Sequence, residues 1–186
     1  MQKLAPASHR YWEVDTARGI AIVLMVIYHF TWDLNHFGIY SGNMLASPWQ
    51  NFARSIATIF IFVMGVSLTL SYNRLKRKLS RKRLLQKNLL RGAKIFGWGL
   101  LITIGTYFFI GDGFVVFGIL HLLGLSIILA SLFLFISRWA SLAAAIVVIG
   151  LGIYAGDLVT ASPWLIWLGV KQAGRYMVDY YPLLPW

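Results

Sequence analysis

Long apolar stretches recur along this chain of 186 residues, and they constrain its fold more than any other feature. A helix rises about 1.5 Å per residue, so about 20 apolar residues cross the roughly 30 Å core of a bilayer. Only 12% of the residues are charged, whereas a soluble domain has roughly 25%. The sequence therefore predicts an all-α, polytopic membrane helix bundle. We expect one domain over residues 1–186, with about five transmembrane helices at 14–37, 53–72, 93–110, 114–136 and 139–156.

Positive charge is distributed unevenly between the apolar stretches. Ten Lys or Arg residues and no acid occur between Arg74 and Lys94, whereas residues 38–49 contain neither Lys nor Arg. Because Lys and Arg favour the cytosolic side, we expect 74–94 to be a cytosolic loop, with the N-terminus inside and the C-terminus outside. The other cations are divided accordingly: Lys3, Arg10, Arg18 and Arg138 inside, and Arg54, Lys171 and Arg175 outside.

The basic segment 74–94 has two interpretations. The interleaved leucines predict a surface helix that lies on anionic lipid head groups; they are Leu75, Leu79, Leu85 and Leu89. Alternatively, some of the cations bind the phosphates of a cytosolic ligand, and charge alone does not separate the two. A net charge of +11 would suggest nucleic acid in a soluble chain. Here the cations cluster between membrane spans, so we expect no nucleic-acid partner.

The first apolar stretch carries several ionisable residues within membrane depth. At about 100° per residue, Arg18 and His29 point almost the same way, Asp33 lies one turn further, and His36 returns to that line. A lipid-facing charge costs about 2.5–3.5 kcal/mol or more, so this stripe should face a bundle interior or a wet cavity. It is a candidate functional site. The alternative is that His29 and Asp33 satisfy each other and only fix helix packing.

Two further residues are site candidates. Arg54 lies at the start of the second apolar stretch, close to the same face of the membrane as His36, and could meet an anionic or polar substrate there. His121 lies between Gly118 and Gly124, which would let another backbone approach its imidazole. A packing histidine that is hydrogen-bonded to a carbonyl is an equally good interpretation of His121. A tight turn at residues 111–113 is expected to join the third and fourth helices.

The end of the chain and the absence of cysteine limit the remaining possibilities. Prolines and aromatic residues follow Asp157 at high density, which predicts an interfacial segment on the outer face. Without cysteine there is no disulfide, no thiolate nucleophile and no cysteine-ligated metal. Intramembrane His and Asp residues suit an enzyme and a small transporter or proton-relay protein equally well, and a structural protein without a reaction is a third class.

Four motifs resemble one known family, in order and over most of the chain. They are D-T-A-R-G-I-A-I-V-L-M-V-I-Y-H-F at 15–30, I-F-I-F-V-M-G-V-S-L at 59–68, F-G-I-L-H-L-L-G-L-S at 117–126 and D-Y-Y-P-L-L-P-W at 179–186. The chain resembles the bacterial membrane family related to heparan-α-glucosaminide N-acetyltransferase. More distantly, it is similar to multi-span acyltransferases that modify cell-surface sugars, whose first helix carries R-G-x-A followed by a histidine.

The resemblance implies transfer of an acetyl group from cytosolic acetyl-CoA to an amine or hydroxyl of a glycan or amino sugar, in the bacterial inner membrane. It implies a catalytic histidine in or just after the first helix and no metal. Two features differ from the relatives. The acid follows the histidine after a shorter gap here, and both His29 and His36 could occupy the catalytic place. Relatives should also continue beyond Trp186 into a further helix, so the chain is expected to be either a C-terminally truncated fragment or a shortened relative, and it could be inactive.

The resemblance and the residues together give one set of site predictions. Imidazole titrates near neutral pH and can take a proton from the acceptor, so His29 is predicted as the catalytic base with Asp33 orienting it. Direct attack and an acyl-histidine intermediate both remain open. The predicted substrate contacts are Arg18, His36, Arg54 and His121. The residues predicted to bind the phosphates of acetyl-CoA are Arg77, Arg81 and Arg83.

Overall fold

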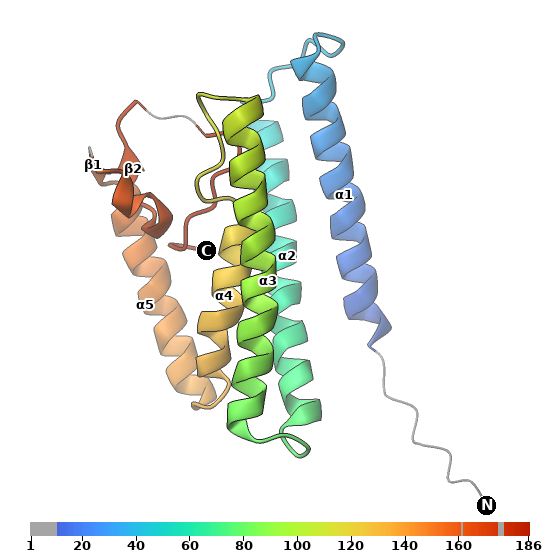
Figure 1. Ribbon diagram of the computed structural model, residues 1–186, viewed down its shortest axis with the longest axis vertical. Helices are drawn as coiled ribbons and strands as arrows, with labels where there is room; N and C mark the ends of the chain where they lie inside the picture. The colour runs from blue at the N-terminus through green and yellow to red at the C-terminus, as the bar shows by residue number, and fades with distance from the viewer. Residues whose placement is uncertain (1–10, 161, 175–176) are drawn as a thin grey trace, which may run out of the picture. The chain divides into compact units, whose positions relative to one another are not determined.

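A computed structural model describes residues 11–160, 162–174 and 177–186. Lys3, Arg10 and Arg175, which entered the orientation prediction, lie outside these residues. The described part contains five α-helices and little else (Figure 1). They are α1 (Trp12–His36), α2 (Ser47–Leu75), α3 (Arg81–Phe109), α4 (Ile119–Phe133) and α5 (Arg138–Gly156).

The helices α1, α2, α3 and α5 are long and apolar enough to cross a membrane, and α4 is a shorter apolar helix. The predicted all-α, polytopic helix bundle is therefore confirmed. After α5 the chain forms a short 3₁₀ helix, η1 (Pro163–Leu168). Two-residue strands, β1 (Val159–Thr160) and β2 (Lys171–Gln172), flank η1 and pair in parallel.

The helix bounds differ from the prediction in the basic segment. The third helix begins at Arg81 and runs without a break to Phe109, so most of the expected loop 74–94 is the first part of a spanning helix. Ser80 starts it, because its hydroxyl accepts a hydrogen bond from the Arg83 N–H at 3.4 Å. Lys and Arg are good helix formers, so charge alone does not end a helix. A separate surface helix in this segment is therefore wrong.

The connection between α3 and α4 is also longer than expected. The predicted turn at 111–113 is in fact an irregular loop over residues 110–118, and α4 covers 119–133 rather than 114–136. Gly111 and Gly113 have φ values of +69° and +96°, in a region where side chains are disfavoured. At about 1.5 Å per residue, the 15 residues of α4 span about 22 Å, less than the bilayer core.

The chain divides into two compact units, the N-terminal unit (Met1–Ser67) and the C-terminal unit (Leu68–Trp186). In the N-terminal unit, Ala21 of α1 is fully buried. Where α1 turns into α2, aromatic rings gather around Tyr28, with ring centroids 6.3–6.4 Å away. These rings belong to Trp32, Trp49 and Phe52. The Asn35 amide holds the connecting loop by donating to the Tyr40 and Gly42 carbonyls at 2.8 and 2.7 Å.

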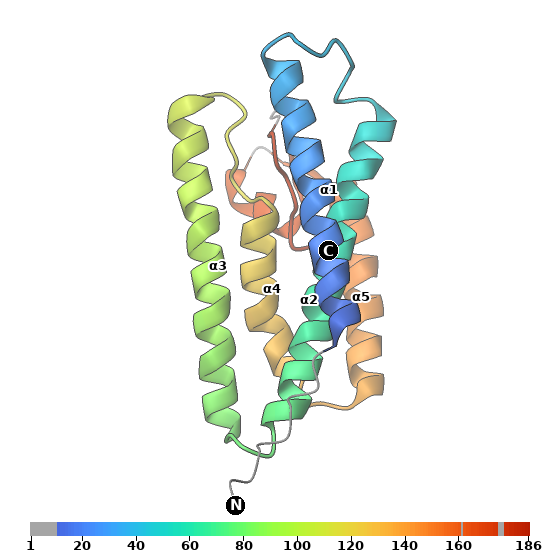
Figure 2. The same cartoon turned by 90° about the vertical axis from the view of Figure 1, so that its right-hand side faces the viewer.

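In the C-terminal unit, α3 and α4 lie side by side (Figures 1 and 2). Glycines let the two backbones approach: a Cβ on Gly92 would stand 2.6 Å from the Gly124 carbonyl oxygen, and a Cβ on Gly124 would stand 2.6 Å from the Phe96 nitrogen. Leu122 and Ile127 of α4 are almost fully buried. This helix pair is the centre of the unit's packing.

The segment 177–186 folds back onto the C-terminal unit. The Val178 and Tyr181 N–H groups donate to the Gly113 and Phe117 carbonyls, both at 3.0 Å, and the Leu183 N–H donates to the Trp167 carbonyl at 2.8 Å. The aromatic and proline-rich ending is thus packed within its own unit. The interfacial character expected of the segment after Asp157 stays a prediction.

Candidate active-site residues

The D-T-A-R-G motif forms a polar cluster in the N-terminal unit. One Arg18 nitrogen lies 3.2 Å from the Asp15 carboxylate, and the other donates to the Ser67 hydroxyl at 2.8 Å. Asp15 lies in the first turn of α1, where its carboxylate also stabilises the positive end of the helix dipole. Arg18 therefore links the start of α1 to α2. Its guanidinium still has unused donors, because it carries five N–H groups.

His29 and Asp33 lie on an exposed side of α1. The face of α1 that packs within its own unit carries Ala21 and Tyr28. At about 100° per residue, this face is roughly a quarter turn around the helix from His29. The His29 ring meets the Tyr28 ring edge-on at 5.7 Å. Among the described residues, no hydrogen bond or ion pair joins His29 to Asp33. Within the described residues, the stripe therefore lies on an exposed side of α1 and not in the predicted bundle interior, and only Arg18 is held in a polar cluster.

His36 and Arg54 are exposed near the ends of their helices. His36 occupies the last turn of α1, where its ring meets the Phe37 ring at 5.5 Å. Arg54 lies in the second turn of α2, and its backbone carbonyl accepts from the Thr58 hydroxyl. Within the described part of the chain, neither side chain forms an ion pair. Both remain open to a ligand.

His121 differs from the other predicted site residues because it is buried, with 2% of its surface exposed. Its Nδ1 accepts the Gly118 N–H at 3.2 Å, and its Nε2 lies 3.4 Å from the Thr103 hydroxyl. An accepting Nδ1 assigns the proton of the neutral ring to Nε2, which then faces Thr103. The ring also packs against Phe96 and Phe117, with centroids 5.1 and 5.4 Å away.

This arrangement makes His121 a cap of its own helix. Gly118 is the N-cap residue of α4, and glycine has no side chain to bond the free N–H groups of the first turn. His121 reaches back to one of them, as Glu or Gln does in a capping box. The structure thus favours the packing interpretation over the site interpretation, with a backbone N–H as the partner in place of the expected carbonyl.

Asp179 is the second cap of α4, and sequence reasoning missed its role. Its Oδ2 accepts the Ile119 N–H at 3.0 Å, where a carboxylate also complements the helix dipole. Gly118 allows this approach, because a Cβ there would collide with the carboxylate. The two partners are 60 residues apart. In the sequence, Ile119 and Asp179 lie in two of the motifs that carry the family resemblance, but this does not indicate that the two residues pair.

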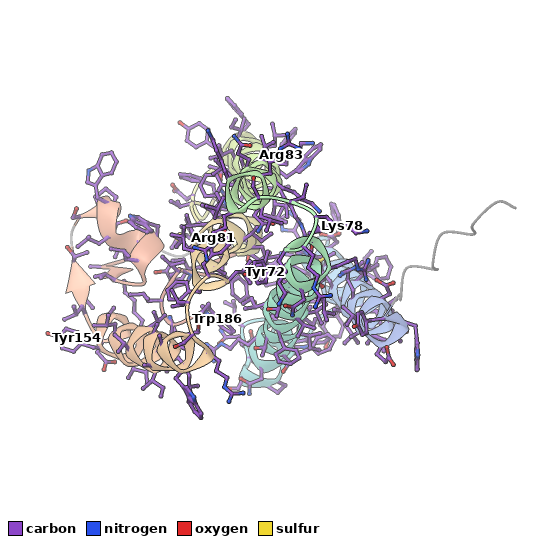
Figure 3. All side chains as sticks on the ribbon, turned by 90° about the horizontal axis from the view of Figure 1, so that it is seen from below. Tyr72, Lys78, Arg81, Arg83, Tyr154 and Trp186 are labelled. Carbon is purple, nitrogen blue, oxygen red and sulfur yellow. The ribbon has the colours of Figure 1, made fainter. Side chains whose placement is uncertain are left out.

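The predicted donor-binding cations lie at the turn between α2 and α3. Figure 3 shows Lys78, Arg81 and Arg83 around this turn, and all three are exposed. The Arg81 guanidinium lies 5.6 Å from the centre of the Phe135 ring, and Lys76 lies at the same distance from the Tyr72 ring. No acid occurs between Arg74 and Lys94 to neutralise them.

The described residues contain no group of three or more His, Asp or Glu side chains that could hold a metal ion. The candidate residues are suited to proton transfer and to charge recognition. The exposed imidazoles of His29 and His36 can accept a proton, and the cations at the turn between α2 and α3 can bind an anion.

A comparison with known families gives these residues their context. A family model described as heparan-alpha-glucosaminide N-acetyltransferase, catalytic, matches residues 10–186. The chain belongs to this family. No curated protein and no solved structure matches the chain. The family match confirms the resemblance inferred from the four motifs, and with the apolar helices it identifies a multi-pass membrane protein of an N-acetyltransferase family.

Proposed function

We propose that this protein transfers an acetyl group from cytosolic acetyl-CoA to an amine or hydroxyl of a glycan. The family match over residues 10–186 carries this proposal. The acceptor's lone pair attacks the thioester carbonyl carbon, the carbon–sulfur bond breaks, and the acceptor proton ends on the released CoA thiol. The products are the acetylated acceptor and free CoA. A base that removes the acceptor proton speeds this reaction by about 10²–10⁴-fold.

His29 is the base in this proposal, and Asp33, one turn along α1, stabilises its charged form. The exposure of both side chains supports access by a substrate. An acetyl-His29 intermediate would divide the same reaction into two steps and need the same residue. His36 and Arg54, which are exposed, contact the acceptor. Arg18 uses its remaining donors for substrate in addition to holding α1 to α2. Substrate contact by His121 stays a prediction, since its hydrogen bonds support a capping role.

The reaction has a direct test, because the chain contains no cysteine. A thiol reagent therefore reports released CoA without background from the protein. Purified protein in detergent, given acetyl-CoA and glucosamine as the probe acceptor, should release thiol and form acetylated glucosamine in equal amounts. Thiol release without acetylated product would indicate hydrolysis alone. No turnover with amino-sugar and hydroxyl acceptors would contradict the proposal and favour the transporter class.

For the donor, we propose that Arg77, Arg81 and Arg83 bind the phosphates of acetyl-CoA and that the remaining cations of the segment contact anionic lipids. Replacing these three residues by Gln should raise the Michaelis constant for acetyl-CoA while the protein still inserts normally. The matched control removes three nearby exposed lysines by the same substitution: Lys78, Lys82 and Lys87. Equal Michaelis constants in the two triple variants would leave only a general charge effect.

For the location, we propose the bacterial inner membrane with the turn between α2 and α3 in the cytosol. The ten cations between Arg74 and Lys94, against none in residues 38–49, support this orientation. Single cysteines at Ser80 and Ser41 can be compared in intact cells with an impermeant thiol reagent. Labelling should occur at position 41 only. Labelling at position 80 but not at 41 would reverse the orientation.

A further inference from the structure

The chain that follows α5 builds a small platform, which we define as residues 157–160 and 162–172. Its strands pair Val159 with Lys171, and η1 lies between them. The inner side of η1 is held by the tail: the Tyr180 hydroxyl donates to the Ile166 carbonyl at 2.9 Å, and the Leu183 N–H donates to the Trp167 carbonyl at 2.8 Å. Only 1% of the Ile166 surface is exposed. The platform is therefore held by the body of its unit.

The same 3₁₀ helix carries large apolar side chains that are partly or largely exposed. Trp164 is 82% exposed, Trp167 41% and Leu165 40%. Lys171 is also exposed, at the edge of the pair of strands. Exposed indole rings and an exposed lysine in one short segment match the chemistry of a membrane interface, where Trp prefers the head-group level and Lys reaches the phosphates.

The length of α5 is compatible with a location of this surface at the membrane interface. The helix has 19 residues and spans about 28 Å, close to the roughly 30 Å of the hydrocarbon core. Arg138 and Trp139 begin it, with the guanidinium 5.4 Å from the indole ring, which suits one membrane interface. The other end, Gly156, then reaches the opposite interface, and the strands β1 and β2 lie at that end of the helix (Figure 1).

We propose that the platform is an interfacial anchor whose partner is the lipid bilayer, with Trp164, Leu165 and Trp167 inserted at the boundary between head groups and acyl chains. The anchor fixes the height of α5. Through Leu183 and Tyr180 it also fixes the tail that brings Asp179 to the start of α4. The bilayer interface thereby sets the position of a buried helix start. This inference is independent of the acetyl-transfer proposal.

Spin-label depth measurements test the anchor directly, since any single cysteine is unique in this chain. A nitroxide at Trp164→Cys, in vesicles of phosphatidylcholine and phosphatidylglycerol, is compared for collision with oxygen, which concentrates in the hydrocarbon, and with a water-soluble nickel complex. Ile146→Cys in the middle of α5 is the deep reference, and Lys78→Cys is the aqueous reference. Because Trp164 packs on little, its replacement should leave folding intact, and the Leu165→Cys label provides a second reading.

We expect both platform labels to give a depth between the two references, at the head-group level. Collision values equal to those of Lys78→Cys would place the surface in water and overturn the proposal. Values equal to those of Ile146→Cys would place it in the hydrocarbon core and also overturn it. An immobilised label that neither reagent reaches would mean that protein covers the surface, which excludes lipid as its partner.

Discussion

Two histidines of this chain, His29 in α1 and His121 in α4, lie in apolar helices and differ in almost every physical respect. His29 is exposed and, within the described residues, has no hydrogen-bond partner, whereas His121 is 2% exposed and has a neighbour for each ring nitrogen. The difference follows from position in the helix. In mid-helix the backbone N–H groups are already bonded, so the ring of His29 has no local role; in the first turn they are free, and His121 satisfies one of them.

The comparison predicts its largest effect at His29. The variant His29→Ala should lower acetyl transfer by about 10²–10⁴-fold, because it removes the proposed base. Its free energy of unfolding should change by no more than about 0.5 kcal/mol, since an exposed side chain is lost. Thiol release measures the rate of acetyl transfer, and unfolding in detergent measures the change in the free energy of unfolding. Asp33→Asn should reduce turnover less, because the base itself remains.

His36→Ala is the matched control for that prediction, since His36 is also an exposed histidine of α1. We expect it to raise the Michaelis constant for the acceptor and to retain most of the turnover. If His36→Ala is inactive while His29→Ala turns over at a near-normal rate, the base is assigned to the wrong residue, although the acetyl-transfer proposal stands.

A different kind of loss is expected at His121. The variant His121→Ala leaves the Gly118 N–H without its acceptor and opens a cavity beside Phe96 and Phe117. A lost cap costs about 0.5–2 kcal/mol and a large buried side chain about 2–5 kcal/mol, so we expect at least about 2.5 kcal/mol of destabilisation. Unfolding in detergent checks this. The protein that remains folded should retain its turnover.

His121→Gln sharpens the test, because glutamine at this position is the usual capping-box partner of the N-cap N–H. It should recover part of the stability lost in His121→Ala. The opposite outcome, a His121→Ala protein as stable as the parent but inactive, would support the prediction that His121 contacts substrate.

The sequence was sufficient for those features that depend on composition or on spacing within one helix. Apolar stretches predicted the membrane helix bundle, and the angle between Arg18 and His29 followed from the helical period. The start of α3 was missed because hydropathy marks where a helix is apolar, whereas Ser80 and the good helix formers after it determine where the helix begins.

The capping of α4 could not have been predicted from one sequence. Gly118 lies three residues before His121, but this spacing does not show that the imidazole points back along the helix. That direction depends on the irregular loop 110–118, which places the Gly118 N–H within reach of the ring. Asp179 comes from a segment far along the chain, and no periodicity relates it to Ile119. Contacts of this kind require the tertiary fold.

The smallest predicted effect concerns Asp179 and decides whether the two caps act as one unit. The variant Asp179→Ala should lower the free energy of unfolding by about 0.5–2 kcal/mol, the usual cost of removing a helix cap. Asp179→Asn retains an oxygen for the Ile119 N–H and loses only the charge at the positive helix end, so about 0.3–1 kcal/mol is expected. Asp112→Ala removes an exposed carboxylate in the loop before α4; it is the control and should change the free energy of unfolding little.

A double-mutant cycle tests whether the two caps are coupled, and it compares the unfolding of Asp179→Ala, His121→Ala and the double variant. Because both side chains hold the same helix start, the double variant should lose less than the sum of the single losses. Strict additivity would mean that the tail and the imidazole cap α4 independently, and then the position of the platform would have no influence on His121.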